Sequence, residues 1–518
     1  MKKITITLSV LLLTSMMLFG QNEYDALRYS QQYYDGTARS LAMGNALVSL
    51  GGDMGALSYN PAASGVYRYS ELMITPSIYT NNSKVSYLGH NSDENRTRFA
   101  LSNIAWVGGF SSGSHRGFMG MNFAITANQT NNFNFRTSAS GIEAQTSFLA
   151  SMAANMPDIN GSSLTQLADD PTYPYFNTDA SWTSILAWNT GVLDTLFAPN
   201  AYYGATENIA GGKVFVPGNL NQRYYNERTG YVQDVVFNAS GNVSDIFFFG
   251  LNVTLQSIWF SEFSSYSEDA ENPDLFQTGF SNFVSEYRQS TSGLGVNVKF
   301  GFIVRPIAGL SIGGSISTPN WMFLTDTWKE NFEGNTAQYG KHSLSSPTGT
   351  FDYKINAPFK WNLGIGYTFG NFLALGVDYE RADYSTIKMM DSYGYTRDFE
   401  IENEKISDKF RAVNNIRAGL EFKALPQMPI RLGYNYYESS IKDVDNSRHY
   451  VSAGIGYASD GGFFVDLGYQ QQCNYNEENY TLYDSYRSNP YDEYDAPVPV
   501  VSEKYRNWKL LLTLGLRF

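Results

Sequence analysis

The final residues of the chain alternate between apolar and polar side chains. From Trp508 to Phe518 the even positions are apolar, and most of the odd positions are not. A period of two places successive side chains on opposite faces of a strand. The pattern predicts a strand with one apolar face that ends on an aromatic residue. Bacterial outer-membrane barrels often end this way, and so do some soluble sandwiches, so the rest of the chain must decide between them.

The same alternation recurs in pairs of runs joined by short turns. One pair, 361–369 and 373–379, flanks a turn at 369–371. Six such turns are predicted, near 108–117, 240–245, 305–309, 369–371, 424–429 and 458–462. Six hairpins and the unpaired runs at 70–79 and 505–518 make about fourteen strands, and an even number places both termini of the chain on the same side of the barrel.

The long connections then all fall on the opposite side. They are 80–97, 129–229, 261–287, 319–357, 383–410, 439–448 and 473–504. Short turns on one side and long loops on the other are typical of an outer-membrane barrel, whereas a propeller or paired sandwiches would show blade repeats or a linker. The predicted fold is an all-β transmembrane antiparallel β-barrel of about fourteen strands, formed by residues 70–518.

The N-terminus predicts export from the cytoplasm. Lys2 and Lys3 precede an apolar run from Leu8 to Phe19, which is too short to span a bilayer as a helix. A small residue, Gly20, follows, so residues 1–20 are predicted to be a signal peptide cleaved near Gly20, with the start of a buried core as the alternative. The only cysteine is Cys473, so no lipidated cysteine follows the signal.

Composition supports a barrel and excludes other classes. The chain has 15% aromatic and 16% charged residues, with 38 Tyr, 34 Phe and 46 Gly. A mean hydropathy of -0.30 excludes a bundle of membrane helices, but a barrel hides its polar half in the lumen. The net charge of -13 argues against a nucleic-acid partner, and a single cysteine rules out a disulfide framework.

The stretch 21–69 precedes the first predicted strand and contains a distinctive run. The run through Asp53 to Asn60-Pro61-Ala62-Ala63 resembles the hatch of the long-chain fatty-acid transporter (FadL/TodX-like) family of outer-membrane proteins. The segments 302–321, 358–384 and 415–437 are similar to the strand and turn patterns of that family. The resemblance covers most of the mature chain and is weakest across 130–230.

The resemblance implies a fourteen-stranded barrel whose lumen is plugged by an N-terminal hatch, residues 21–69. It implies passive transport of hydrophobic small molecules, long-chain fatty acids above all, with capture at extracellular loops and lateral release where the third strand bends inward. In this chain the third strand is roughly 116–128, and Gly117 and Gly120 are the positions where glycine makes a bend easiest. The alternative is that both glycines only complete a tight turn.

The hatch can also be interpreted from its residues alone. Asp53 is placed to cap a short helical turn that Pro61 stops after Asn60. Asn60 is expected to hold the lumen wall by hydrogen bonds, with Ala62 in the same motif. A simple Asn-Pro turn into the first strand is the alternative.

Candidate ligand-binding residues lie in the longest connection, 129–229, and on the barrel strands. Apolar residues at steps of three and four predict two amphipathic helices, near 148–156 and across Trp182, Ile185, Leu186, Leu193, Leu196 and Phe197. They form either a capture groove or a lid packed on itself. Arg417 and Arg431 fall on the lumen phase of their strands, where they either bind a carboxylate head group or form ordinary ion pairs.

No catalytic site is predicted. The four histidines His90, His115, His342 and His449 do not lie beside a Gly-x-Ser-x-Gly signature. The alternatives to transport are an outer-membrane adhesin or structural barrel and a haem-binding receptor. The sequence predicts no cofactor and no metal. The expected partners are a hydrophobic small-molecule ligand, outer-membrane lipid and lipopolysaccharide, and the barrel-assembly machinery through the strand ending at Phe518; the expected state is a monomer in the Gram-negative outer membrane.

Overall fold

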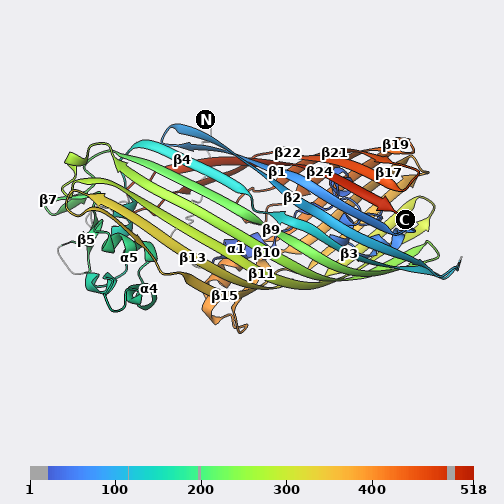
Figure 1. The fold of residues 1–518 in the computed structure, drawn as a ribbon, viewed down its shortest axis with the longest axis horizontal. Helices are drawn as coiled ribbons and strands as arrows, with labels where there is room; N and C mark the ends of the chain where they lie inside the picture. The colour runs from blue at the N-terminus through green and yellow to red at the C-terminus, as the bar shows by residue number, and fades with distance from the viewer. Residues whose placement is uncertain (1–20, 115, 197–199, 487–495) are drawn as a thin grey trace, which may run out of the picture.

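The computed structural model describes residues 21–114, 116–196, 200–486 and 496–518 and shows an elongated, closed β-barrel (Figure 1). In spatial order its wall consists of β1 (Glu71–Tyr87), β2 (His90–Ser111), β3 (Phe118–Asn132), β9 (Leu220–Val243), β10 (Phe247–Ala270), β11 (Phe280–Ile307), β12 (Leu310–Ser317), β16 (Lys360–Phe369), β17 (Leu373–Asp383), β19 (Ala412–Leu425), β20 (Met428–Tyr437), β21 (Arg448–Ala458), β22 (Phe463–Gln472) and β24 (Val500–Arg517). All neighbours are antiparallel, and β24 pairs with β1 to close the wall. The predicted barrel of about fourteen strands is confirmed.

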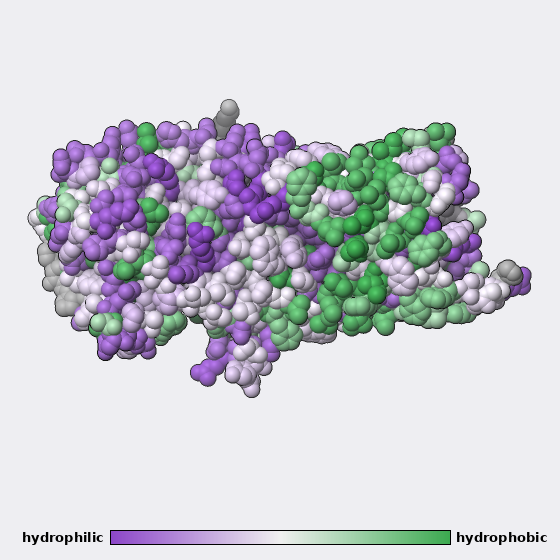
Figure 2. All heavy atoms as spheres, in the orientation of Figure 1, coloured by the Kyte–Doolittle hydropathy of each residue, from purple (hydrophilic) through white to green (hydrophobic). Residues whose placement is uncertain are grey.

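The alternation of side chains produces an apolar band around one end of the barrel. On β24, Leu512, Leu514 and Leu516 are exposed on the outer face, while Lys509 and Thr513 are buried in the lumen. Figure 2 shows the exposed apolar side chains gathered at the end that carries the short turns, and polar side chains covering the other end. A band of this kind suits lipid, whereas the polar end suits water.

Several strands run far beyond this band. β11 has 28 residues, although about 9–11 residues suffice to cross a bilayer. The connections expected at 80–97 and 261–287 are largely strand: β1 and β2 meet at a tight turn after Tyr87, and β10 and β11 are separated by a short segment with η4 (Pro273–Leu275). The sequence pattern missed these extensions because both strand faces are polar where water replaces lipid.

Four wall strands are interrupted and then continue. β3 continues as β4 (Phe135–Ala144), β12 as β13 (Trp321–Thr336), β15 (Gly349–Asn356) as β16, and β17 through η5 (Tyr384–Thr386) as β18 (Lys388–Asp391). β14 (Gly340–Ser345) pairs with β13, and β23 (Asn476–Thr481) pairs with β24. η6 (Arg397–Phe399) and α6 (Glu400–Lys409) follow β18.

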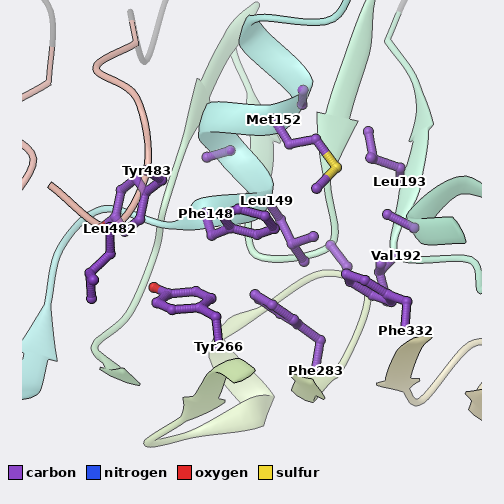
Figure 3. Packing of buried hydrophobic residues seen from close by; sticks show 14 of the residues in the cluster. Phe148, Leu149, Met152, Val192, Leu193, Tyr266, Phe283, Phe332, Leu482 and Tyr483 are labelled. Carbon is purple, nitrogen blue, oxygen red and sulfur yellow. The ribbon is translucent and has the colours of Figure 1, made fainter. Parts of the chain in front are cut away.

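The connection between β4 and β9, residues 145–219, is hereafter the cap. It contains α3 (Phe148–Ala154), η3 (Gly161–Leu164), α4 (Tyr173–Asn177), α5 (Trp182–Asn189), β5 (Leu193–Thr195), β6 (Tyr202–Gly204), β7 (Asn208–Ala210) and β8 (Lys213–Phe215). It lies at the polar end of the barrel (Figure 1). Phe148 and Leu149 of α3 face Tyr266, Phe283 and Phe332 from β10, β11 and β13 (Figure 3). The cap therefore shares one apolar core with the ends of the barrel strands.

Residues 21–69, hereafter the N-terminal segment, lie in the lumen. They form α1 (Glu23–Ser30), α2 (Ala38–Ala42), η1 (Gly55–Ser58) and η2 (Pro61–Val66). α2 packs against β21, β22 and β24, while η2 packs against β9, β10 and β11 on another side of the lumen. At Gly433 on β20 the wall approaches so closely that a Cβ atom would overlap the backbone of Gly44. Only glycine fits there.

None of the helices in the described ranges is both long and apolar enough to cross a membrane.

Candidate functional site

The predicted hatch residues lie together in the lumen. The Asp53 carboxylate accepts hydrogen bonds of 2.8 Å from the Thr37 hydroxyl and the Gly55 amide, so it joins two turns of the segment. Asn60 caps η2 by accepting from the Ala62 amide at 3.0 Å, and its NH2 group donates to the carbonyl of Phe302 on β11 at 3.3 Å. The carbonyl of Pro61 accepts from Asn238 on β9 at 2.9 Å. Asn60, Pro61 and Ala62 thus stabilise the start of η2 and connect it to β9 and β11.

Ala62, the fourth hatch residue, is fully buried. It packs with Phe248 of β10 and Ile303 of β11. The wall residue Gly250 leaves space for the Pro61 carbonyl, which a Cβ atom would displace. Both polar and apolar contacts therefore seat this turn against β10 and β11.

Arg431, one of the predicted ligand-binding arginines, belongs to a buried charged network. Its guanidinium donates to Glu421 at 2.7 Å and to Asp466 at 2.5 Å. Arg39 of the N-terminal segment pairs with the same Glu421 carboxylate at 3.0 Å. We call Arg39, Glu421, Arg431 and Asp466 the charged lock. It fastens the N-terminal segment to β19, β20 and β22.

Arg417, the second predicted arginine, also contacts protein groups, although its buried Nε makes no hydrogen bond within the described residues. It lies 3.3 Å from the Glu380 carboxylate and donates to the side-chain oxygen of Asn362 at 2.6 Å. Its guanidinium carbon lies 4.8 Å from the centre of the Tyr59 ring. Burial is complete. The structure therefore gives both arginines carboxylate partners in the lumen.

The predicted apolar residues of the cap lie mainly in its core. Ile185 and Leu186 on α5 and Leu193 on β5 are buried, and the half-buried Trp182 ring lies 5.4 Å from the ring of Trp328 on β13. Leu196 is half-buried beyond β5, and Phe197 lies outside the described residues. The sequence pattern allowed two arrangements, a capture groove and a lid packed on itself. The buried side chains here are arranged as a packed lid.

A groove of ≈ 310 Å³ does lie beside this core. Leu193 lines it, together with Trp188 from α5 and with Tyr339 and His342 from the β13–β14 hairpin. The sequence pattern did not single out these neighbours, because they meet only through the pairing of β13 with β14.

The wall is interrupted between β2 and β3. Their ladder runs from Ser111↔Gly120 to Asn103↔Asn128, and in the described chain no backbone pairing joins β2 to β3 or β4 beyond that point. The carbonyls of Gln129 and Thr130 instead accept from the amides of Asp35 and Tyr33 at 3.0 and 2.7 Å. The third wall strand thus leaves its neighbour and pairs with the N-terminal segment. We call this place, between residues 91–102 of β2 and residues 129–138, the wall break.

Hydrogen bonds and ion pairs made by side chains, in place of a strand ladder, bridge the wall break. Ser138 of β4 donates to Glu94 of β2 at 2.9 Å, and Arg96 of β2 pairs with Glu227 of β9 at 2.5 Å. Side-chain bridges of this kind separate at lower cost than a continuous strand ladder.

Some apolar side chains lie at the outer edge of the wall break and behind it, although the run 129–134 itself is mostly polar. Phe99 on β2 is 83% exposed, and Leu101 is 40% exposed. Behind them, the buried Phe133 ring lies 5.9 Å from Tyr29 of α1 and 5.6 Å from Phe260 of β10. Apolar side chains are therefore present on the outer surface and on the lumen side of the wall break.

Gly117 and Gly120 lie at the other end of β3. Gly117 forms the short turn with a φ of 73°, and Gly120 pairs with Ser111. Their role in an opening stays a prediction. The third strand stops pairing with β2 after Asn128. The sequence contains a signal for this change, because the polar run 128–134 interrupts the alternation of the third strand.

Metal ligation has no candidate in the described part of the chain, where no three His, Cys, Asp or Glu side chains group together. His449 contacts the Tyr434 hydroxyl through Nδ1 at 2.8 Å.

Comparison with known proteins identifies the fold. No protein-family model matches the chain. No curated protein sequence matches it either. Among solved structures, the toluene transporter TodX of P. putida is 12% identical over 94% of this chain and 99% of its own, with a TM-score of 0.52. A FadL homologue of Pseudomonas aeruginosa is 13% identical over 93% and 98%, also at 0.52. The chain thus has a FadL/TodX-like barrel fold.

Proposed function

We propose that this protein is a passive outer-membrane channel for hydrophobic small molecules, which enter at the cap and leave sideways through the wall break. The observation that carries the proposal is the loss of β2–β3 pairing beyond Asn103↔Asn128 in a barrel whose first and last strands pair to close it. A route through the wall delivers an apolar molecule directly into lipid. A route straight down the lumen meets the charged lock, where burying an apolar molecule would separate paired charges.

The neighbours in fold support an apolar cargo. One of them is a toluene transporter, and another is a homologue of FadL. We infer that the cargo of this chain is of the same kind, with long-chain fatty acids as the first candidates. A lipid bilayer offers apolar molecules a favourable destination, so no energy source is needed.

The cap fits the role of an entrance. Its aromatic core lies at the polar end of the barrel, where it would meet molecules arriving from outside. The proposal places the chain as a monomer in a Gram-negative outer membrane, in contact with lipopolysaccharide. Export would use residues 1–20, which lie outside the described residues, and assembly would use β24. An adhesin or structural barrel would need no break in its wall.

Closing the wall break chemically tests the proposal. Ser92 of β2 hydrogen-bonds to the carbonyl of Ser138 on β4, so the pair S92C and S138C spans the break. The exposed Cys473 is first replaced by serine. Cells that carry this variant are treated with a short bifunctional methanethiosulfonate, and the uptake of radiolabelled oleate and toluene is followed before and after reduction.

The matched control is the pair N82C and N95C, whose native side chains contact each other within the β1–β2 hairpin. We expect the bridge across the break to reduce uptake to the level of cells without the protein, reduction to restore it, and the control bridge to leave it unchanged. Equal uptake with the break bridged would disprove lateral release. No uptake by the unmodified protein would disprove transport of these molecules.

A further inference from the structure

Three arginines gather around one carboxylate at the wall break. Glu227 on β9 accepts from Arg96 of β2 at 2.5 Å and from Arg136 of β4 at 2.8 Å. Arg98 lies two residues after Arg96 on the same strand, so both side chains leave the same face. Arg98 is exposed and makes no ion pair within the described residues. The positive charges of Arg98 and Arg136 both repel that of Arg96.

The other carboxylates of the break have partners of their own. Glu94 accepts from the Ser138 hydroxyl. Asp93, on the outer face of β2, lies opposite Lys84 of β1 in the strand register. Each oxygen of Glu227 already accepts from one of its two arginines. Within the arginine group, three positive charges are therefore accompanied by one negative charge.

One donor of this group has no acceptor. The Nε atom of Arg96 is buried and makes no hydrogen bond in the described part of the chain. A buried donor without a partner is costly, and an anion beside it would offset that cost. Guanidinium groups bind phosphate through paired, planar hydrogen bonds, and a phosphate offers several oxygens at once. The group therefore fits a phosphate placed between β2 and β4.

The arginines lie just outside the apolar band. The exposed rings of Tyr231 on β9 and Trp259 on β10 lie 6.1 Å apart at the edge of this band. Aromatic belts of this kind mark the level of the lipid head groups. Glu227 lies beyond Tyr231 on β9, about 13 Å farther along the strand at the usual rise per residue. The group around Glu227 is thus placed where the phosphates of the outer lipid leaflet are expected.

An apolar stripe on β2 continues from the arginines toward the short-turn end. Phe99 is 83% exposed, and Leu101, Ile104 and Trp106 are also exposed. Phe99 lies opposite Ile78 of β1 in the strand register. An exposed apolar stripe that begins beside a charged group matches a molecule with acyl chains below a phosphorylated head group.

We propose that the arginines at the wall break bind a phosphate of an outer-leaflet glycolipid of the lipid A type, whose acyl chains lie along Phe99 and Leu101. The phosphate links Arg98 of β2 to Arg136 of β4, where the strand ladder is missing. The glycolipid therefore covers the break from outside until it is displaced. This inference rests on the proposed function only for the placement of the chain in an outer membrane, and it involves no transported molecule.

The test measures lipid binding by native mass spectrometry on the mature full-length protein in a non-ionic detergent. The probes are lipid A with both phosphates, the same lipid A without phosphates, and phosphatidylglycerol. For the double variant R98Q and R136Q we expect the affinity for phosphorylated lipid A to fall about tenfold or more, since charge-assisted contacts are lost. The affinity for dephosphorylated lipid A should stay the same. The double variant R98K and R136K, which keeps the charges, should retain part of the lost affinity.

R288Q serves as the matched control. Arg288 of β11 lies in the same cross-strand row as Arg136, with Glu227 and Phe263 between them. Its side chain is 59% exposed, and its guanidinium carbon lies 4.1 Å from the centre of the Phe263 ring. The ladders on both sides of β11 are paired at this row. The substitution removes the same charge away from the break, so it should leave all three affinities unchanged. Retained migration of the unheated barrel on a gel verifies that each variant is folded.

The outcomes separate this inference from the proposed function. An unchanged affinity of the R98Q and R136Q variant for phosphorylated lipid A, or an equal loss in R288Q, would overturn the site. Equal binding of the two forms of lipid A to the unmodified protein would show that no phosphate is recognised. If phosphatidylglycerol binds as tightly through the same arginines, the assignment to a glycolipid is wrong. Because these measurements contain no transported molecule, each of these failures leaves hydrophobic transport intact.

Discussion

The two ends of the lumen are held together by different forces. At the short-turn end, the charged lock and the hydrogen bonds of Asn60 fix the N-terminal segment in one position. At the other end, rings such as Phe148, Phe283 and Phe332 hold the cap. Buried charge pairs are directional and costly to separate, whereas apolar contacts have no required direction. We therefore expect the cap to be the mobile part and the N-terminal segment to keep its position in the lumen.

Opening the charged lock should have the largest effect. The substitution R431M leaves Glu421 and Asp466 buried without this partner, and we expect a loss of about 3–5 kcal/mol in the free energy of unfolding. Urea titration measures this loss, and single-channel recording should show a leak of small ions as the N-terminal segment loosens. R411M is the control, because the Arg411 side chain is 42% exposed in its pair with Glu438. Equal stability of R431M and the unmodified protein would show that the lock is not structural.

Removing one ring from the cap core should cost less and act locally. Phe283 stacks on Phe332 with ring centres 5.3 Å apart, and F283A should destabilise the docked cap by about 3 kcal/mol. Limited proteolysis should then cleave residues 145–219 faster while the urea midpoint of the barrel stays in place. L167A, at a cap residue that is 49% exposed, is the control. If F283A lowered the urea midpoint of the barrel as well as speeding cleavage of the cap, the two ends would unfold together and the prediction would be wrong.

The smallest predicted effect comes from buried carboxyl groups that join the cap to the strands. Glu268 of β10 accepts from the Phe148 amide at 2.8 Å, and Glu330 of β13 accepts from the Thr183 hydroxyl at 2.6 Å. Burial raises the pKa of Glu268 to about 7 and that of Glu330 to about 8. No lysine or arginine in the described chain lies within ion-pair distance of either group.

The sign of the pH dependence follows from these raised values. In the docked cap, Glu268 and Glu330 keep their protons up to their raised pKa values. In an open cap their pKa would be near 4.5, so they would release these protons at a lower pH. Docking is therefore strongest below that value and weakens as the pH rises through about 7 and about 8. We expect this weakening to appear as lower hydrogen-exchange protection factors in α3 and α5 at pH 8.5 than at pH 5.5, after correction for the intrinsic rise of exchange rates with pH. The double variant E268Q and E330Q should lose this dependence, and its persistence would rule out these two groups as its cause.

The sequence predicted the lipid-facing half of the barrel well and the rest less well. Alternation is visible on β16 and β24 because lipid demands apolar residues on one face and the lumen accepts polar ones on the other. On the outer part of β1, residues 80–87, water lies outside, so both faces are largely polar and the strand was predicted as a loop. Helical spacing near 148–156 identified α3, because a packed core imposes it. The helix predicted across 182–197 was wrong beyond Asn189, where α5 ends, since Leu193 lies on the strand β5.

The candidate sites depend on partners far apart in the sequence. Nothing near Arg431 reveals that Arg39 shares its carboxylate, and nothing near Arg417 reveals that the Tyr59 ring lies against its guanidinium. Such contacts arise only when the N-terminal segment enters the lumen.

The last strand closes the wall and also anchors the N-terminal segment. β24 pairs with β1, its Lys509 bonds to Asp35, and its Thr513 accepts from the amide of Ala38 at 2.8 Å. A copy whose synthesis stopped before β24 would lack the seam and this anchor together. The residues that close the barrel therefore also hold the N-terminal segment, so a copy without β24 would have an open strand edge and a loosened segment at the same time.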